Sequence, residues 1–471
     1  MPGPAMPKVT TWQLAAASAV IGLALAAGLI VASGPWDSGQ RKAERDWAAA
    51  RGRTGGADHG HPARPSAPAA APSAPAVLAA LGRAATPTGK GLGKVLGPLM
   101  DDPALGPVRS GVVIDTATGE RLFGSKPDRA MTPASTVKLA TMAAGLSALG
   151  PGHRIATTVS ASPDGKRLTL EGGGDPTLDR DRLRALADET VRVLRDRGVT
   201  SVRLGYDTSL YSGPAQHPIG PNDNIAPVSA LMTDEGRLET SDHGPAPRSG
   251  DPAGDAARAF AGLLADRHVG SSRAPAHGEA PPHSEPVART YSAPLSDLVE
   301  RALTNSDNDI AEAVARQTAL ATGRPASFEG AGRAVAAQLK KLGMPLDGAR
   351  FADGSGLDRH DKVSAGLLAT LLSRSGEPAH PELRPVLTGL PVAGFSGTLG
   401  ARYTDASRAT GLLHGKTGTL TGVNTLAGTV VDDRGRLLAF AFMASGTASA
   451  AEAESALDRL GTAVASCGCA Q

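Results

Sequence analysis

The sequence has little cysteine, few aromatic residues and almost no net charge. Its 471 residues include two cysteines, 3% aromatic residues and a formal net charge of +2. This balance gives no case for a nucleic-acid partner, which would require a basic surface. Cys467 and Cys469 have one residue between them, which is too close for an ordinary stapling bridge, and we interpret them as part of a non-catalytic tail at 467–471.

Lysine is scarce as well, because only 11 of the 48 basic residues are lysine. Lys138 is the only one with a serine, Ser135, three residues before it. Pro133 suits the entry turn of a helix predicted to continue through 139–149, and this spacing places both side chains on one face. A serine hydroxyl needs a base to become a good nucleophile, and a lysine whose pKa of about 10.4 is lowered by burial or a second cation can serve. Arginine could not, because it does not deprotonate in proteins. The pair predicts a nucleophile and its general base.

The N-terminal region is apolar and then rich in alanine and proline. Residues 11–33 contain roughly 19–20 consecutive uncharged residues, enough for a helix that crosses a membrane. This length favours a retained anchor after a cytoplasmic tail at 1–10, while a cleaved signal peptide and a buried soluble helix stay open as alternatives. Residues 34–90 predict a disordered linker. Either membrane interpretation places the rest of the chain outside the cytoplasm.

The body of the chain predicts an α+β fold with an insertion. Strands are expected at 110–115, 121–124, 155–162, 167–171, 202–206, 412–420, 424–432 and 437–444. Helices are expected at 181–197, 256–264, 297–303, 310–322, 329–342, 364–373 and 449–464, with loops at 239–255 and 273–286. An antiparallel sheet would combine the strands at both ends. We therefore predict one domain at 91–154 and 289–466, interrupted by an inserted α/β domain at 155–288.

Two further clusters carry polar chemistry. Ser306 and Asn308 lie between two predicted helices, where a hydroxyl can relay a proton and an amide can hold a substrate carbonyl and a lysine; a simple helix N-cap is the alternative. The stretch His414–Thr419 opens a predicted edge strand. In this stretch Lys416 would help to lower the pKa of Lys138, Gly418 would allow a ligand close to the backbone, and Thr417 and Thr419 would offer hydroxyls to a carboxylate. The alternative is a strand end with a solvated lysine.

Two other patterns carry less weight. Gly172-Gly173-Gly174 is not followed by Lys-Ser/Thr, so we interpret it as a tight connector and not as a phosphate-binding loop. His277 and His283 have no carboxylate or cysteine nearby in the sequence and are interpreted as surface residues, not as metal ligands.

The three clusters occur in the order Ser135-x-x-Lys138, Ser306-x-Asn308 and Lys416-Thr417-Gly418, a pattern that resembles the penicillin-recognising serine enzymes. Two segments, Gly172–Leu178 and Phe351–Arg359, are similar to those of the penicillin-binding protein 4 type of D-alanyl-D-alanine carboxypeptidase/endopeptidase. The resemblance covers roughly residues 95–465. It implies a β-lactamase/transpeptidase-like antiparallel sheet flanked by helices.

The resemblance also implies a function and a role for each motif residue. A peptidoglycan stem peptide would acylate Ser135 and release D-alanine, with Lys138 as base, and β-lactam antibiotics would acylate the same residue. Catalysis would further use Ser306 for proton transfer, Asn308 for orientation and Lys416 for its charge, and the resemblance implies no metal and no cofactor. The expected substrate-binding residues are Thr417, Gly418, Thr419 and, for the acidic end of the diamino acid, Arg359; a surface arginine is the alternative for the last.

Some alternatives stay open. The insertion is shorter than is usual for this group, which leaves the balance between carboxypeptidase and endopeptidase undecided. A β-lactamase would share the acylation step, and a non-catalytic β-lactam or wall sensor would share only the binding. The expected location is outside the cytoplasm, anchored in the cell membrane, or secreted if the first helix is cleaved.

Overall fold

The computed structural model describes residues 89–467, apart from residues 272, 405 and 406. The membrane span predicted at 11–33 and the linker up to residue 88 lie outside this part of the chain. Among the residues that are described, no helix combines the length and the apolar character needed to cross a membrane.

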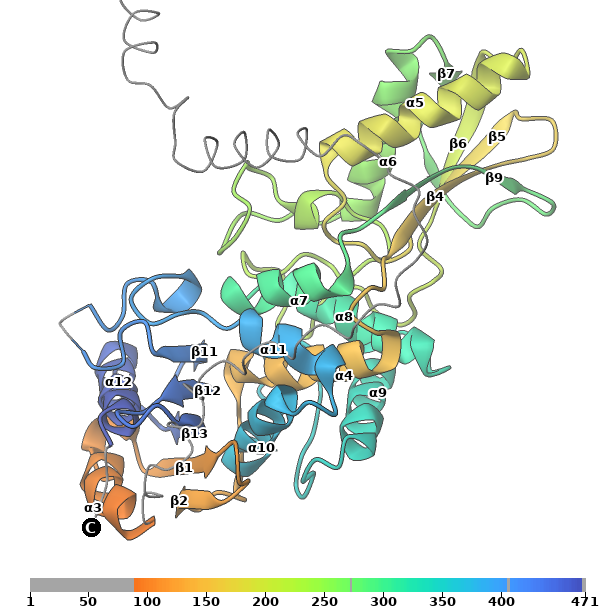
Figure 1. The fold of residues 1–471 in the computed structure, drawn as a ribbon. Helices are drawn as coiled ribbons and strands as arrows, with labels where there is room; N and C mark the ends of the chain where they lie inside the picture. Colours follow the sequence, from red (N-terminus) through yellow and green to blue (C-terminus); the bar gives the residue numbers. More distant parts are fainter. Residues whose placement is uncertain (1–88, 272, 405–406, 468–471) are drawn as a thin grey trace, which may run out of the picture. The chain divides into compact units, whose positions relative to one another are not determined.

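A five-stranded antiparallel sheet joins the two ends of the described chain, in the order β11-β12-β13-β1-β2 (Figure 1). The strands are β1 (Val108–Asp115), β2 (Arg121–Ser125), β11 (Leu413–Leu420), β12 (Val423–Val431) and β13 (Leu437–Ser445). β1 pairs with β13 along its whole length, from Val108 opposite Ser445 to Asp115 opposite Leu438. The predicted α+β fold, with a sheet built from both ends of the chain, is confirmed.

Helices cover both faces of this sheet. α3 (Gly89–Met100) and α12 (Ala450–Ala465) pack against one face, where Leu96 and Phe440 belong to one apolar cluster. α10 (Ala365–Gly376) packs against β1 and β13 and belongs to a second cluster. Because successive strand side chains point to opposite faces, two covered faces leave β12 and β13 buried at nearly every residue.

The helix that follows Ser135 lies at the centre of the helical layer. This helix, α4 (Lys138–Leu149), is buried from Lys138 to Leu146, as expected for a helix that is apolar on all sides. It contacts α7 (Leu295–Thr304), α8 (Asn308–Ala321), α9 (Phe328–Lys341) and α10, while α11 (Arg384–Thr388) packs on α7. The start of α4 is therefore fixed by packing from several directions.

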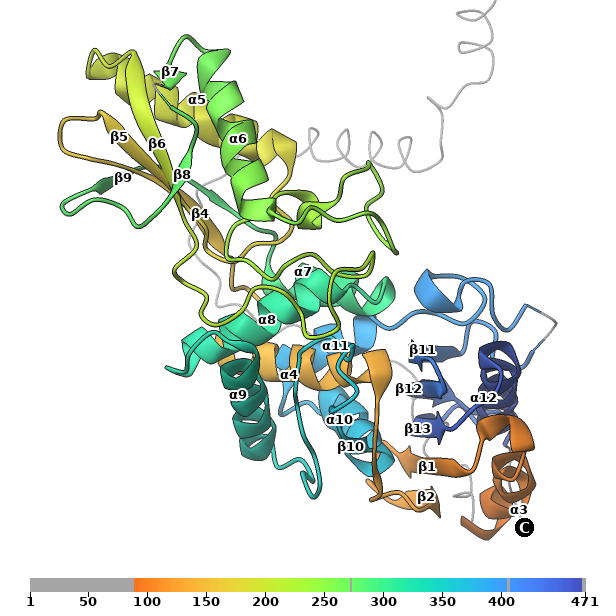
Figure 2. The same ribbon diagram turned by 180° about the vertical axis from the view of Figure 1, so that it is seen from behind.

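A second sheet lies between α4 and α7 in the sequence (Figure 2). Its strands are β4 (Ala156–Ala161), β5 (Arg167–Glu171), β6 (Ser201–Asp207), β7 (Gly270–Ser271), β8 (Ala276–His277) and β9 (Glu285–Tyr291). β4 runs antiparallel to β5 and β9, whereas β6 is parallel to β5. α5 (Arg180–Asp196) and α6 (Pro252–Ala265) share an apolar cluster with this sheet.

Three local expectations were wrong. β8 and the start of β9 fall in the predicted loop 273–286, because β9 is stabilised by pairing with β4, which no local pattern reveals. α6 begins at Pro252, inside the predicted loop 239–255, since Asp251 caps it and proline suits the first helical position. Cys467 is disulfide-bonded, although we expected no bridge in this tail.

Candidate active site

Ser135 lies in a short 3₁₀ turn, Ala134–Val137, that leads directly into α4. Ala134 has a φ of 49°, and Ser306, in the second motif, has a φ of 60°. Non-glycine residues rarely adopt positive φ, and such strain concentrates at sites that the surrounding structure holds in place. Strained backbone therefore lies directly before the first predicted motif and within the second.

Lys138 is fully buried and its Nζ makes three hydrogen bonds. Nζ lies 3.0 Å from Oγ of Ser135, 2.7 Å from Oδ1 of Asn308 and 2.6 Å from the carbonyl oxygen of Ser355. A neutral amine has two N–H bonds and one lone pair. The two N–H bonds match Asn308 and Ser355, which leaves the lone pair to accept the hydroxyl proton of Ser135.

Burial lowers the pKa of Lys138 from 10.5 to about 8. The negative charges of Asp353, Asp307, Glu312 and Asp361 oppose this shift but do not cancel it. About one lysine in ten is then neutral at pH 7, compared with about one in three thousand at the ordinary pKa. A neutral amine is thus far more available beside Ser135 than it would be at an exposed lysine.

Lys416 of β11 faces the second motif. Its Nζ donates to Oγ of Ser306 at 2.9 Å and to the carbonyl oxygen of Thr417 at 2.8 Å. Burial and the nearby charge of Lys138 lower the pKa of Lys416 well below its ordinary value. The structure thereby brings the three predicted clusters together around two buried lysines, although α4, α8 and β11 are far apart in the sequence.

The rest of the third motif runs past Ser135 along β11. A β-carbon on Gly418 would lie 2.7 Å from the carbonyl oxygen of Pro133 and 3.1 Å from the amide nitrogen of Ser135. Only glycine allows this approach without a shift of the strand. Oγ1 of Thr417 donates to Thr398 at 2.9 Å, and Oγ1 of Thr419 donates to Glu454 at 3.1 Å.

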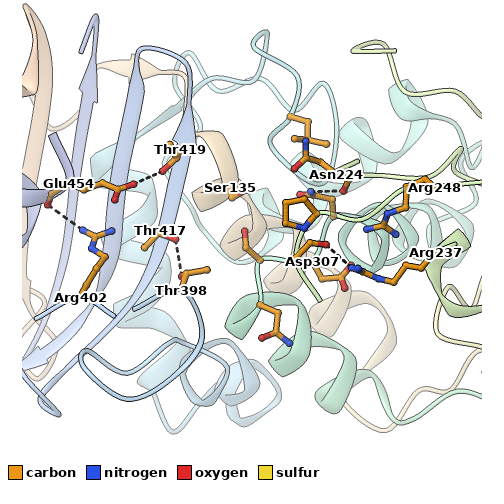
Figure 3. A pocket seen from close by; sticks show the side chains of 16 residues that line it. Ser135, Asn224, Arg237, Arg248, Asp307, Thr398, Arg402, Thr417, Thr419 and Glu454 are labelled. Carbon is orange, nitrogen blue, oxygen red and sulfur yellow. Dashed lines mark hydrogen bonds between the residues drawn. The ribbon is translucent and has the colours of Figure 1, made fainter. Parts of the chain in front are cut away.

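Ser135, Ser306, Asn308, Thr417 and Thr419 line one pocket of about 340 Å³. Figure 3 shows Ser135 between the two sides of this pocket. One side carries Thr398, Arg402, Thr417, Thr419 and Glu454, and the other carries Asn224, Arg237, Arg248 and Asp307. Arg359 is exposed, does not line this pocket, and donates from Nη2 to the carbonyl oxygen of Thr421 at 2.9 Å.

Sequence reasoning missed the contribution of the segment between β6 and α6. The carbonyl oxygen of Asn224 accepts a hydrogen bond from Nδ2 of Asn308 at 2.9 Å, which fixes the amide so that Oδ1 faces Lys138. Arg248 forms an ion pair with Asp309 at 2.9 Å. No local signal marks these residues, since a polar loop has the same composition whether or not it contacts a site.

Two buried groups of side chains hold donor atoms that could bind a metal ion: His217, Glu312 and Asp353, and Glu235, Asp307 and Asp309. Protein groups already engage members of both sets. Arg237 pairs with Glu235 at 3.0 Å, and Glu312 accepts the backbone N–H groups of Gly354 and Ser355, each at 2.9 Å. We interpret both groups as internal hydrogen-bond networks, and the absence of a metal or cofactor from the reaction stays a prediction.

A serine hydroxyl beside a buried lysine, faced by a second serine and a second lysine, defines the class of penicillin-recognising serine enzymes. The model of the D-Ala-D-Ala carboxypeptidase 3 (S13) family matches residues 93–249 and 242–464. The chain belongs to this family. The predicted activity, that of a serine-type D-alanyl-D-alanine carboxypeptidase, is confirmed.

Individual proteins are also similar to this chain in sequence or in structure. The chain is 38% identical over 426 residues to the carboxypeptidase DacB of Mycolicibacterium smegmatis, covering 86% of this chain and 90% of that protein. The crystal structure of penicillin-binding protein 4 from Haemophilus influenzae matches with a TM-score of 0.65 and 21% identity, covering 79% of this chain and 97% of the other. A structure of that protein complexed with a β-lactam matches with a TM-score of 0.61 and 21% identity, covering 78% and 97%. These structures confirm the type of fold.

Proposed function

We propose that Ser135 is the nucleophile of this carboxypeptidase and that Lys138 is its general base. The observation that carries the proposal is the 3.0 Å contact between Nζ of Lys138 and Oγ of Ser135, made while Asn308 and Ser355 accept the other two hydrogen bonds. This arrangement directs the lone pair of a neutral lysine at the one hydroxyl that lines the pocket at the start of α4.

The proposed reaction begins when the proton of Ser135 moves to Lys138 as Oγ bonds to the carbonyl carbon of the penultimate D-alanine. The backbone N–H groups of Ser135 and Thr419 stabilise the oxyanion, and one such donor is typically worth about 10²–10³ in rate. Ser306, which is hydrogen-bonded to Lys416, passes its hydroxyl proton to the leaving nitrogen and regains one from Lys138, so that D-alanine departs and Lys138 is neutral again. Water, activated by Lys138, then hydrolyses the ester.

Substrate recognition in this proposal uses the hydroxyls of Thr417 and Thr419, which would bind the terminal carboxylate of the stem peptide. Both line the pocket with Ser135. Arg359 lies beside the turn between β11 and β12, where it would bind the acidic end of the diamino acid. A β-lactam would acylate the same serine; the structure of the Haemophilus influenzae protein complexed with a β-lactam supports β-lactam binding.

The location of the enzyme is also a proposal. The apolar stretch at 11–33 would anchor the protein in the cytoplasmic membrane, with 155–288 as an inserted α/β domain of the exported part. Fractionation of cells expressing the full chain is expected to place it in the membrane fraction, and deletion of residues 11–33 to release it. Recovery of the full chain in the soluble cytoplasmic fraction would contradict this proposal.

The function is tested with the full chain, a peptide ending in D-Ala-D-Ala and a fluorescent penicillin. We expect release of D-alanine and a stable covalent label. Rapid turnover of penicillin without release of D-alanine would instead identify a β-lactamase. Labelling without turnover of either compound would identify a sensor.

The pH dependence of acylation follows from the lowered pKa of Lys138. The base acts in its neutral form, so protonation removes activity as the pH falls below a pKa of about 8. We expect the second-order rate of penicillin labelling to rise about tenfold per pH unit from pH 6 towards 8 and then to level off. Stopped-flow labelling between pH 6 and 9.5 measures this, and a flat profile over that range would exclude a lysine base with this pKa.

A further inference from the structure

His217 lies buried in the segment between β6 and α6, far in sequence from every predicted catalytic residue. Its side chain has no exposed surface, and its Nε2 lies 3.0 Å from Oδ2 of Asp353, itself only 1% exposed. The backbone N–H of Ile219 donates to Nδ1 at 3.3 Å. Because the N–H group of Ile219 can only donate, Nδ1 of His217 is the acceptor. Nε2 therefore carries the ring hydrogen and donates a hydrogen bond to Asp353.

Asp353 begins a turn, residues 353–358, that comes after α9 in the sequence, and its carboxylate holds this turn in place. Oδ1 accepts the backbone N–H of Gly356 at 2.6 Å, and Oδ2 accepts that of Asp358 at 2.7 Å. Glu312 of α8 holds the same turn from the other side through the N–H groups of Gly354 and Ser355. Two buried carboxylates therefore fix a turn that has no regular secondary structure of its own.

This turn reaches the catalytic centre at two points. The carbonyl oxygen of Ser355 accepts the 2.6 Å hydrogen bond from Nζ of Lys138. A β-carbon on Gly356, where φ is 86°, would lie 2.1 Å from the carbonyl oxygen of Ala134, the residue before Ser135. A displacement of the turn would therefore move both the base and the backbone beside the nucleophile.

We propose that His217 is a positioning residue for Lys138, acting through Asp353 and the carbonyl group of Ser355. The proposal rests on the proposed function and adds to it a role for the inserted segment. His217 touches no substrate. It orients Asp353, and Asp353 fixes the turn that contains Ser355. The carbonyl oxygen of Ser355 then sets the direction of one N–H bond of Lys138, and this direction determines where the lone pair that faces Ser135 points.

The orientation of the His217 ring is also held by packing. The ring of Phe328 packs against it edge-on, with 5.2 Å between the ring centroids. An alternative role as a metal ligand is poorly supported, because Nε2 already donates to Asp353 and Nδ1 already accepts from Ile219. A small error in the position of a catalytic group can cost about 100-fold in rate, so a contact two steps away from Lys138 can affect acylation measurably.

The test separates acylation from binding in the full-chain protein. We expect His217→Ala to lower the first-order rate of penicillin acylation by about 10- to 100-fold, while the dissociation constant of the preceding complex changes by less than about threefold. His217→Gln keeps an N–H donor of similar reach and is expected to recover most of the rate. His277→Gln, at an exposed histidine of the same inserted region, is the matched control and should label at the unaltered rate.

If His217→Ala does not fold, His217→Asn replaces it, since this polar side chain is one methylene too short to reach Asp353 in the same way. Thermal melting shows which variants are folded. A folded alanine or asparagine variant with the unaltered acylation rate would overturn the proposal. Failure of the unmutated protein to acylate would instead refute the proposed function, and the two failures are thus distinguishable.

Discussion

Replacement of Ser135 by alanine is expected to abolish both penicillin labelling and D-alanine release. In the proposed reaction Ser135 is the only group that forms a bond to the substrate, and removing the nucleophile of a serine hydrolase lowers the rate by roughly 10⁶-fold. The substitution deletes one oxygen at the pocket surface, so the fold should be retained. Gel fluorescence with penicillin and a D-alanine assay, both at pH 8, measure the two losses.

The matched control is Ser466→Ala, at an exposed serine at the end of α12 whose Oγ donates only to the carbonyl oxygen of Thr462. This variant should label and release D-alanine as the unmutated protein does. Persistence of a covalent label in a folded Ser135→Ala variant would show that another residue is the nucleophile.

Replacement of Lys138 by alanine is expected to slow acylation by about 10²–10⁴-fold, the usual contribution of a general base. Lys138→Arg should be as impaired, because arginine retains the charge but does not deprotonate. Single-turnover labelling measures the rate, and it should no longer rise with pH between 6 and 8.

Both lysine variants alter a fully buried side chain, so their thermal stability must be measured beside the rate. Lys340→Ala, at an exposed lysine of α9, controls for the general effect of removing a lysine. A folded Lys138→Arg variant that acylates within about tenfold of the unmutated rate would exclude proton transfer to Lys138.

The parts of the fold that follow local rules could be predicted from the sequence. β11, β12 and β13 are separated by turns rich in glycine and aspartate, and α5 has a clear amphipathic pattern. α3 was not predicted, because four glycines and Pro98 give Gly89–Met100 a poor helix propensity. Leu92, Leu96 and Met100 nevertheless share one face, and their packing in the cluster with α12 stabilises this helix.

The three motifs could be singled out because the proposed reaction requires particular residue types at fixed spacing, and the structure brings their side chains together. Their surroundings could not be singled out in this way. Glu312 and Asn224 act through contacts between segments 43 and 84 residues apart, from Glu312 to Ser355 and from Asn224 to Asn308. Such contacts leave no periodic pattern in the sequence. His217 was not predicted for the same reason, because its contact with Asp353 joins residues that are far apart in the sequence.

The central claim is that the amine of Lys138 activates the hydroxyl of Ser135, so that this serine carries the acyl group. The most direct test is to acylate the full-chain protein with penicillin, digest it and locate the modified residue by peptide mass spectrometry. We predict a single penicilloyl adduct on Ser135, formed faster at pH 8 than at pH 6. An adduct on any other residue, or none at saturating penicillin, would contradict the account.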